Sequence, residues 1–204
     1  MEKPLITLTL IAAILPTCAF AGIGNSFSYV GLGTVYSDFT ELNFAPDVAE
    51  NGYAPMTLSD STSGFGTRFF YGQHFGEYLA FEAGASFMSK PDFTLKNGTT
   101  KVHSGEFSTF GLDFKAFATF PITNSQFIRA HAGVMLWDND SEVISGPSGN
   151  TSISKDSDTD VSPIYGIGYG YAFNKSNALV LEFETTEIAS EKVENISLSF
   201  LVKL

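Results

Sequence analysis

The chain has 204 residues, of which 44% are hydrophobic, and it includes 20 Phe and 8 Tyr. Its formal net charge is −11, which excludes a nucleic-acid-binding protein because that class needs a basic surface. The length fits one domain.

The first 21 residues predict a cleaved signal peptide. Lys3 provides a basic start, residues 5–15 form an apolar run, and Ala19-Phe20-Ala21 has the small-x-small pattern of a signal-peptidase site. The run is too short for a membrane-spanning helix, which needs about 20 residues. A lipoprotein modified at Cys18 is the competing interpretation, which the bulky Thr17 disfavours. Cleavage leaves residues 22–204 as the mature chain and removes the only cysteine. No disulfide or cysteine nucleophile is then expected.

Beyond the signal peptide, apolar and polar residues alternate in segments that match tilted membrane strands of about 9–11 residues. A soluble sandwich gives the same alternation, but the aromatic content and the number of segments favour a lipid-facing wall. Every charge in these segments falls on the face opposite the apolar stripe. We therefore predict an all-β fold, an eight-stranded antiparallel up-and-down transmembrane β-barrel. The predicted strands are 30–37, 65–74, 79–87, 109–120, 128–137, 164–173, 179–184 and 195–204.

The predicted connections alternate between short and long, as in outer-membrane barrels. Short turns are expected near 75–77, 121–126 and 174–177, with Gly76 in a left-handed conformation. Long polar surface loops are expected at about 40–62, 90–105, 138–160 and 186–194.

Four stretches of the mature chain carry a resemblance to a known family. They are DVSPIYGIGYGYAFNKSNALVLEFE (160–184), YVGLGTVYSDF (29–39), LAFEAGASF (79–87) and AGVMLW (132–137). Together they resemble the OmpA-like transmembrane domain family. The resemblance implies a multi-pass β-barrel in the outer membrane of a Gram-negative cell, surrounded by lipid and lipopolysaccharide and inserted by the barrel assembly machinery. It also implies interior charges at Glu82, Lys115 and Glu182, whereas the family's arginine on the seventh strand is Val180 here.

Charged residues of both signs fall on the predicted inner face. They are Arg68, Glu82, Asp113, Lys115, Arg129, His131, Glu182 and Glu184. An unpaired charge in a narrow lumen is costly, so we predict a paired network. The network is interpreted as a plug that stabilises the barrel, with a small or gated ion path as the alternative.

Catalysis is not expected. Barrel enzymes that act on acyl chains place a His and a Ser at the lipid-facing wall, and here His74 and His131 point inward while His103 lies in a predicted loop. No cofactor or metal is expected. The acidic loop 138–160 lacks the Gly and terminal Glu of a dedicated calcium loop.

The sequence therefore predicts a non-enzymatic envelope protein. Its acidic surface loops are expected to make adhesion- or colonisation-type contacts, with host surfaces or phage as partners. The alternative is a narrow channel or transporter for ions or small apolar molecules.

Overall fold

The computed structural model describes residues 26–39, 57–88, 91–97, 100–145 and 152–204. The predicted signal peptide, 1–21, and most of the predicted loop 40–62 lie outside the described residues. No helix in the described part of the chain is long and apolar enough to cross a membrane.

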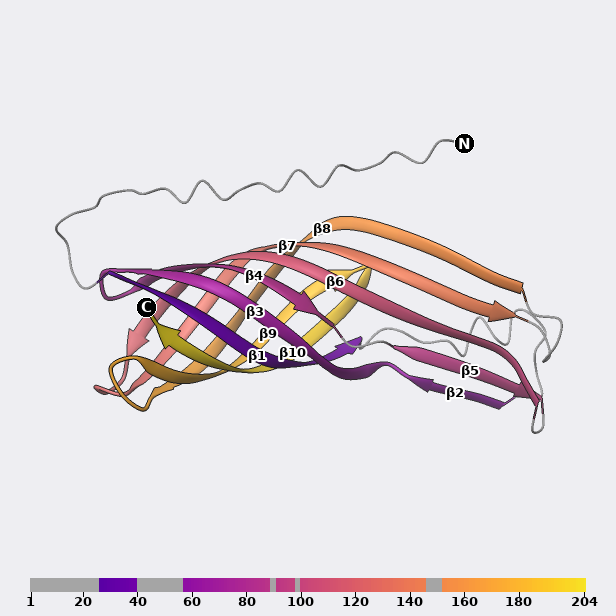
Figure 1. Ribbon diagram of the computed structural model, residues 1–204, viewed down its shortest axis with the longest axis horizontal. Coiled ribbons are helices and arrows are strands. Elements are labelled where there is room, and N and C mark those ends of the chain that lie inside the picture. Colours follow the sequence, from indigo (N-terminus) through magenta and orange to yellow (C-terminus); the bar gives the residue numbers. More distant parts are fainter. Residues whose placement is uncertain (1–25, 40–56, 89–90, 98–99, 146–151) are drawn as a thin grey trace.

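The described residues form ten antiparallel strands, of which eight close into a ring (Figure 1). The ring runs β1-β3-β4-β6-β7-β8-β9-β10 and returns to β1, while β2 and β5 extend the sheet beside β6. The strands are β1 (Phe27–Phe39), β2 (Thr57–Ser61), β3 (Ser63–Phe75), β4 (Leu79–Phe87), β5 (Asp92–Asn97), β6 (Thr100–Pro121), β7 (Gln126–Ser145), β8 (Ser152–Ala172), β9 (Asn177–Ile188) and β10 (Glu191–Lys203). The predicted eight-stranded barrel is confirmed.

The two faces of the wall follow the predicted alternation. Leu32 on β1 lies opposite Phe69 on β3 and Phe200 on β10, and all three side chains are exposed on the outside. The neighbouring pair Val35 and Ser197 is buried inside. Successive side chains of a strand point to opposite faces, so this register places the apolar side chains of each strand on the outside of the barrel. It places the charged side chains of the same strands in the lumen.

The short turns lie at one end of the barrel. Gly76, in the turn between β3 and β4, has a φ of 65°, which confirms the predicted left-handed position. At the opposite end, the predicted loop 186–194 is instead a tight hairpin. Strands β9 and β10 pair up to Ile188 and Glu191, so only Ala189 (φ 53°) and Ser190 (φ 66°) form the turn. A two-residue turn with both φ values positive matches the twist of the flanking strands.

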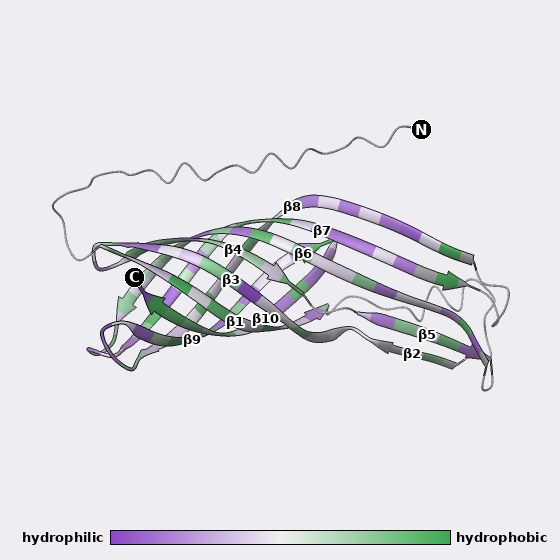
Figure 2. Ribbon diagram, in the orientation of Figure 1, coloured by the Kyte–Doolittle hydropathy of each residue, from purple (hydrophilic) through white to green (hydrophobic). Residues whose placement is uncertain are grey.

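Two other predicted loops are largely strand. β7 and β8 stay paired from Gln126–Tyr171 to Ser145–Ser152, so the ladder runs through most of the span 138–160. Likewise, β5 and the start of β6 occupy most of 90–105. These strands project well beyond the barrel (Figure 1), and β7 and β8 are mainly hydrophilic there (Figure 2). Apolar alternation marks only the lipid-embedded part of a strand, whereas backbone pairing continues into water without it.

Inward glycines make room for aromatic rings in the lumen. A Cβ atom on Gly72 would lie 2.2 Å from the Tyr29 ring, one on Gly31 would lie 2.1 Å from Phe70, and one on Gly170 would lie 2.0 Å from Phe127. These glycines allow bulky rings to fill an interior that is only wide enough for side chains.

Candidate functional site

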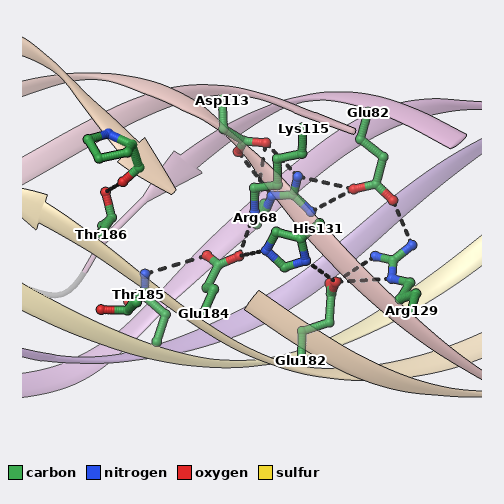
Figure 3. A network of polar contacts seen from close by, with 12 residues as sticks. Arg68, Glu82, Asp113, Lys115, Arg129, His131, Glu182, Glu184, Thr185 and Thr186 are labelled. Carbon is green, nitrogen blue, oxygen red and sulfur yellow. Dashed lines mark hydrogen bonds and ion pairs between the residues drawn. The ribbon is translucent and has the colours of Figure 1, made fainter. Parts of the chain in front are cut away.

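The eight predicted interior charges come from β3, β4, β6, β7 and β9, and the structure brings all of them together in the lumen (Figure 3). Each is nearly inaccessible to solvent. They converge because each occupies an inward-facing position at a similar height along the barrel axis. Glu82 pairs directly with Lys115 across β4 and β6, for example, and Gly84 lies opposite Asp113.

Arg68 is held by two carboxylates. Its Nε and Nη2 donate to the two oxygens of Asp113 at 3.1 and 2.6 Å, and its Nη1 donates to Oε2 of Glu82 at 3.1 Å. The guanidinium also lies 4.4 Å from the centre of the Phe70 ring. Two-pronged arginine–carboxylate contacts of this kind are strong and geometrically specific.

Glu82 links Arg68 to a second arginine. Its Oε1 accepts from Nη1 of Arg129 at 2.8 Å and from the hydroxyl of Tyr29 at 2.9 Å. Arg129 in turn donates through Nε to Glu182 at 3.0 Å and lies 4.2 Å from the centre of the Phe117 ring.

Lys115 and His131 complete the network. Nζ of Lys115 donates to Glu184 at 2.5 Å and lies 3.9 Å from Asp113. The ring nitrogens of His131 face two carboxylates, with Nδ1 3.6 Å from Glu182 and Nε2 3.4 Å from Glu184. Four carboxylates thus meet three permanent cations, with His131 between two of the carboxylates.

Apolar clusters lie in the lumen on both sides of the network. Along the inner face of β9, Val180 precedes Glu182 and Glu184, and Ile188 follows them. The layer on the side of the short turns contains Tyr29, Phe70, Val180 and Leu201. The layer on the side of the projecting strands contains Phe39, Met88, Met135, Trp137, Ile164, Ile188 and Val193.

Several of these contributors were not identified from the sequence. The Tyr29 hydroxyl, the Phe70 and Phe117 rings, and Asn195, whose Nδ2 donates to Glu184 at 3.5 Å, were all missed. The alternation of inward and outward positions along each strand already placed these side chains inside. That alternation does not show which neighbouring strand each side chain reaches.

The described part of the chain has no group of three or more His, Cys, Asp or Glu side chains arranged to hold a metal ion. His131 lies among carboxylates, and His74 stacks on Phe27 with ring centres 4.9 Å apart.

A second charged region lies on the projecting parts of β7 and β8. Its acids are Asp138, Asp140, Glu142, Asp156, Asp158 and Asp160, and its base is Lys155. Lys155 donates to Glu142 at 2.5 Å across the two strands, and this hydrogen bond, with the attraction of the carboxylate, raises the pKa of Lys155. The region stays strongly acidic. Its tip, 146–151, lies outside the described residues.

Comparison with known proteins gives one family and one fold. The model of the OmpA-like transmembrane domain matches residues 25–198. Outer membrane protein A of Serratia marcescens is 27% identical over 184 residues, covering 90% of this chain and 49% of that protein. The protein of the same name from Klebsiella pneumoniae is 27% identical over 157 residues, covering 76% of this chain and 42% of that protein. This chain spans about half the length of these curated relatives.

Two solved structures have the same fold. Neisserial surface protein A superposes with a TM-score of 0.55 at 16% identity, covering 88% of this chain and 99% of the other. Ail, the attachment invasion locus protein of Yersinia pestis, in complex with the heparin analogue sucrose octasulfate, superposes with a TM-score of 0.54 at 11% identity and the same coverage.

Proposed function

Because this chain belongs to the OmpA-like transmembrane domain family, β-barrels of the Gram-negative outer membrane, we propose that it is a non-enzymatic envelope protein with two parts. A closed barrel anchors it in the membrane, and the acidic strands that project beyond the barrel make contacts at the cell surface.

The contents of the lumen support the first half of the proposal. Arg68, Arg129 and Lys115 each contact at least one buried carboxylate, and an apolar layer lies on each side of them. An ion entering this path would have to cross apolar side chains and displace paired charges, both of which are costly in a poorly hydrated interior. A channel or transporter, the rival function, needs an open path past the two apolar layers and the charged network between them.

The second half rests on where polar groups are available. The barrel wall presents apolar side chains such as Phe69 and Leu198, which suit lipid and the acyl chains of lipopolysaccharide. Recognition of a soluble or cellular partner therefore falls to the projecting strands. Ail, which shares the fold, is named for attachment and invasion and was solved with a polyanion. The acidic strands here favour a basic partner instead.

Assembly in the outer membrane adds a further partner. We propose that the barrel assembly machinery inserts the chain, with β10 as the last strand of the barrel; its alternation of exposed and buried residues is unbroken from Val193 to Leu201.

Shortening the projecting hairpin tests the surface role. Asn139 and Asp158 face each other across β7 and β8, so replacing residues 140–157 by Asn-Gly makes a short hairpin and leaves the barrel intact. Cells that display the shortened protein at an equal surface level should bind host cells less well than cells that display the full protein. Unchanged binding would contradict a contact role for these strands.

A further inference from the structure

Within the described part of the chain, the projecting part of β8 is paired with a strand on only one side. β7 pairs with it from Ser152 to Tyr171, whereas β9 pairs with it only from Ile164 to Ala172. Among the described residues, no strand pairs with the other edge of residues 152–161. Every residue from 153 to 161 is exposed. We call the unpaired edge of residues 153–161 the free edge.

The backbone groups that point out of the free edge can be identified. In an antiparallel ladder the N–H and C=O groups of one residue point to the same side, and successive residues alternate. The carbonyl of Pro163 accepts from the Thr186 hydroxyl of β9 at 2.9 Å, so odd-numbered residues of β8 point toward the β9 side. Beyond β9 these groups form the free edge, from Ile153 to Val161. Pro163, which has no N–H, stands where β9 stops pairing.

Two of these N–H groups are occupied by the side chain of the preceding residue. The N–H of Ser157 donates to the Asp156 carboxylate at 3.0 Å, and the N–H of Val161 donates to the Asp160 carboxylate at 2.7 Å. These bonds agree with the alternation above, because odd-numbered N–H groups have no partner on β7. The aspartates therefore cap an edge that otherwise offers unpaired donors and acceptors.

We propose that the free edge of β8 docks an extended, lysine- or arginine-rich segment of a partner protein as an added strand. The proposal deepens the surface-contact role proposed above and rests on it. Backbone pairing along an exposed edge is a general mode of peptide recognition. Here the cations of the segment attract the Asp156 and Asp160 carboxylates away from the backbone, and the released N–H groups then bind its carbonyl groups.

The charge of the region selects this partner. Six acids and one base lie on the projecting parts of β7 and β8, and the base, Lys155, is held by Glu142 on the neighbouring strand. Uncharged strands cannot draw the capping carboxylates away. A second copy is disfavoured as well, because two barrels in one membrane have the same orientation. Their free edges would meet in parallel, bringing the same aspartates close together, and opposed like charges are destabilising.

Peptide binding to the folded protein in lipid nanodiscs tests the proposal. The probe is a fluorescent ten-residue peptide of alternating Lys and Val, followed by anisotropy. We expect saturable binding, together with slower hydrogen exchange of the Ser157 and Val161 amides. Two control peptides should bind about tenfold more weakly or less. One has Gln in place of Lys, and the other keeps the charges but carries N-methyl groups on the pairing edge. Equal binding of the N-methylated peptide would reduce the interaction to charge alone and overturn the proposal.

Variants of the protein give an independent test. Ser157→Pro removes an N–H that β7 does not use and should weaken peptide binding about tenfold, whereas Ser157→Ala keeps the N–H and should bind as the parent does. Removing two charges from the free edge, with Asp156→Asn and Asp160→Asn, should weaken binding more than removing two from β7, with Asp138→Asn and Asp140→Asn. Equal effects of the two Ser157 variants would overturn the proposal.

Cell binding separates failure of this proposal from failure of the surface role. If displayed protein binds cells and Ser157→Pro binds equally well, the surface role stands and docking at the free edge is wrong. If the peptide binds but displayed protein never binds cells, the surface role is wrong. The free edge then docks peptides in vitro, but its proposed role in surface contact is wrong as well.

Discussion

Replacing Lys115 by Met should destabilise the barrel strongly, and replacing Lys155 by Met should not. Both lysines contact a glutamate at 2.5 Å, but the Lys115–Glu184 pair is 1% and 5% exposed, whereas the Lys155–Glu142 pair is 71% and 34% exposed. The two pairs thus match in chemistry and distance and differ in burial. Removing one partner of a buried pair costs about 3–5 kcal/mol, because the remaining charge is left without compensation.

The imbalance of charge in the lumen adds to the loss of stability when Lys115 is replaced. Four carboxylates and three permanent cations become four and two, which leaves Glu184 with His131 and Asn195 as its neighbours. At Lys155, solvent screens the Glu142 carboxylate that remains, so little measurable change is expected.

Equilibrium unfolding in urea, for protein folded into lipid vesicles, measures both effects, and the difference in migration between boiled and unboiled samples reports the folded fraction. The double variant Lys115→Met with Glu184→Met removes both charges, so it should be more stable than Lys115→Met alone. Equal losses for Lys115→Met and Lys155→Met, or a double variant worse than the single one, would refute the argument that burial makes these pairs important.

Four further predictions concern the barrel wall, the lumen, the turn between β9 and β10, and the signal peptide. Leu112→Arg, on the lipid face, should lower the free energy of unfolding by about 2–4 kcal/mol near the bilayer midplane; tolerance there would mean that the inside and outside faces are reversed. Gly72→Ala places a methyl group against the Tyr29 ring and should destabilise by about 1–3 kcal/mol, and an unchanged unfolding midpoint would show that the ring moves freely. Ser190→Gly relieves a left-handed residue and should stabilise by about 1 kcal/mol, whereas a loss of stability would contradict this account of the turn. N-terminal sequencing of the mature protein should read from Gly22, and a lipidated N-terminus would show that the leader is processed differently.

The sequence predicted the wall of the barrel well because the wall follows a simple rule. Alternation with period two assigned Leu32 and Phe69 to one face and Val35 to the other, and lipid on the outside requires that assignment along the whole embedded length. The same rule placed Arg68, Glu82 and Lys115 inside. Whether a residue points inward or outward depends only on its position along its own strand. It can therefore be predicted without knowing which strands lie beside it.

This alternation could not predict the register between neighbouring strands. Which inward groups meet depends on how far each strand is shifted against the next, and the pairing of Lys115 with Glu184, 69 residues apart, is settled by the closed ring. The projecting strands were missed for a different reason. From Asp138 onward β7 buries little apolar surface, so the hydrophobic pattern ends while the backbone ladder with β8 continues.

Conductance of the purified protein in a planar lipid bilayer tests the closed lumen most directly. The paired charges between two apolar layers predict no steady current through the protein at moderate voltage, and the same result for the variant with the shortened hairpin, because its lumen is unchanged. A stable, voltage-independent current that scales with the amount of inserted protein would contradict the closed barrel and favour a channel.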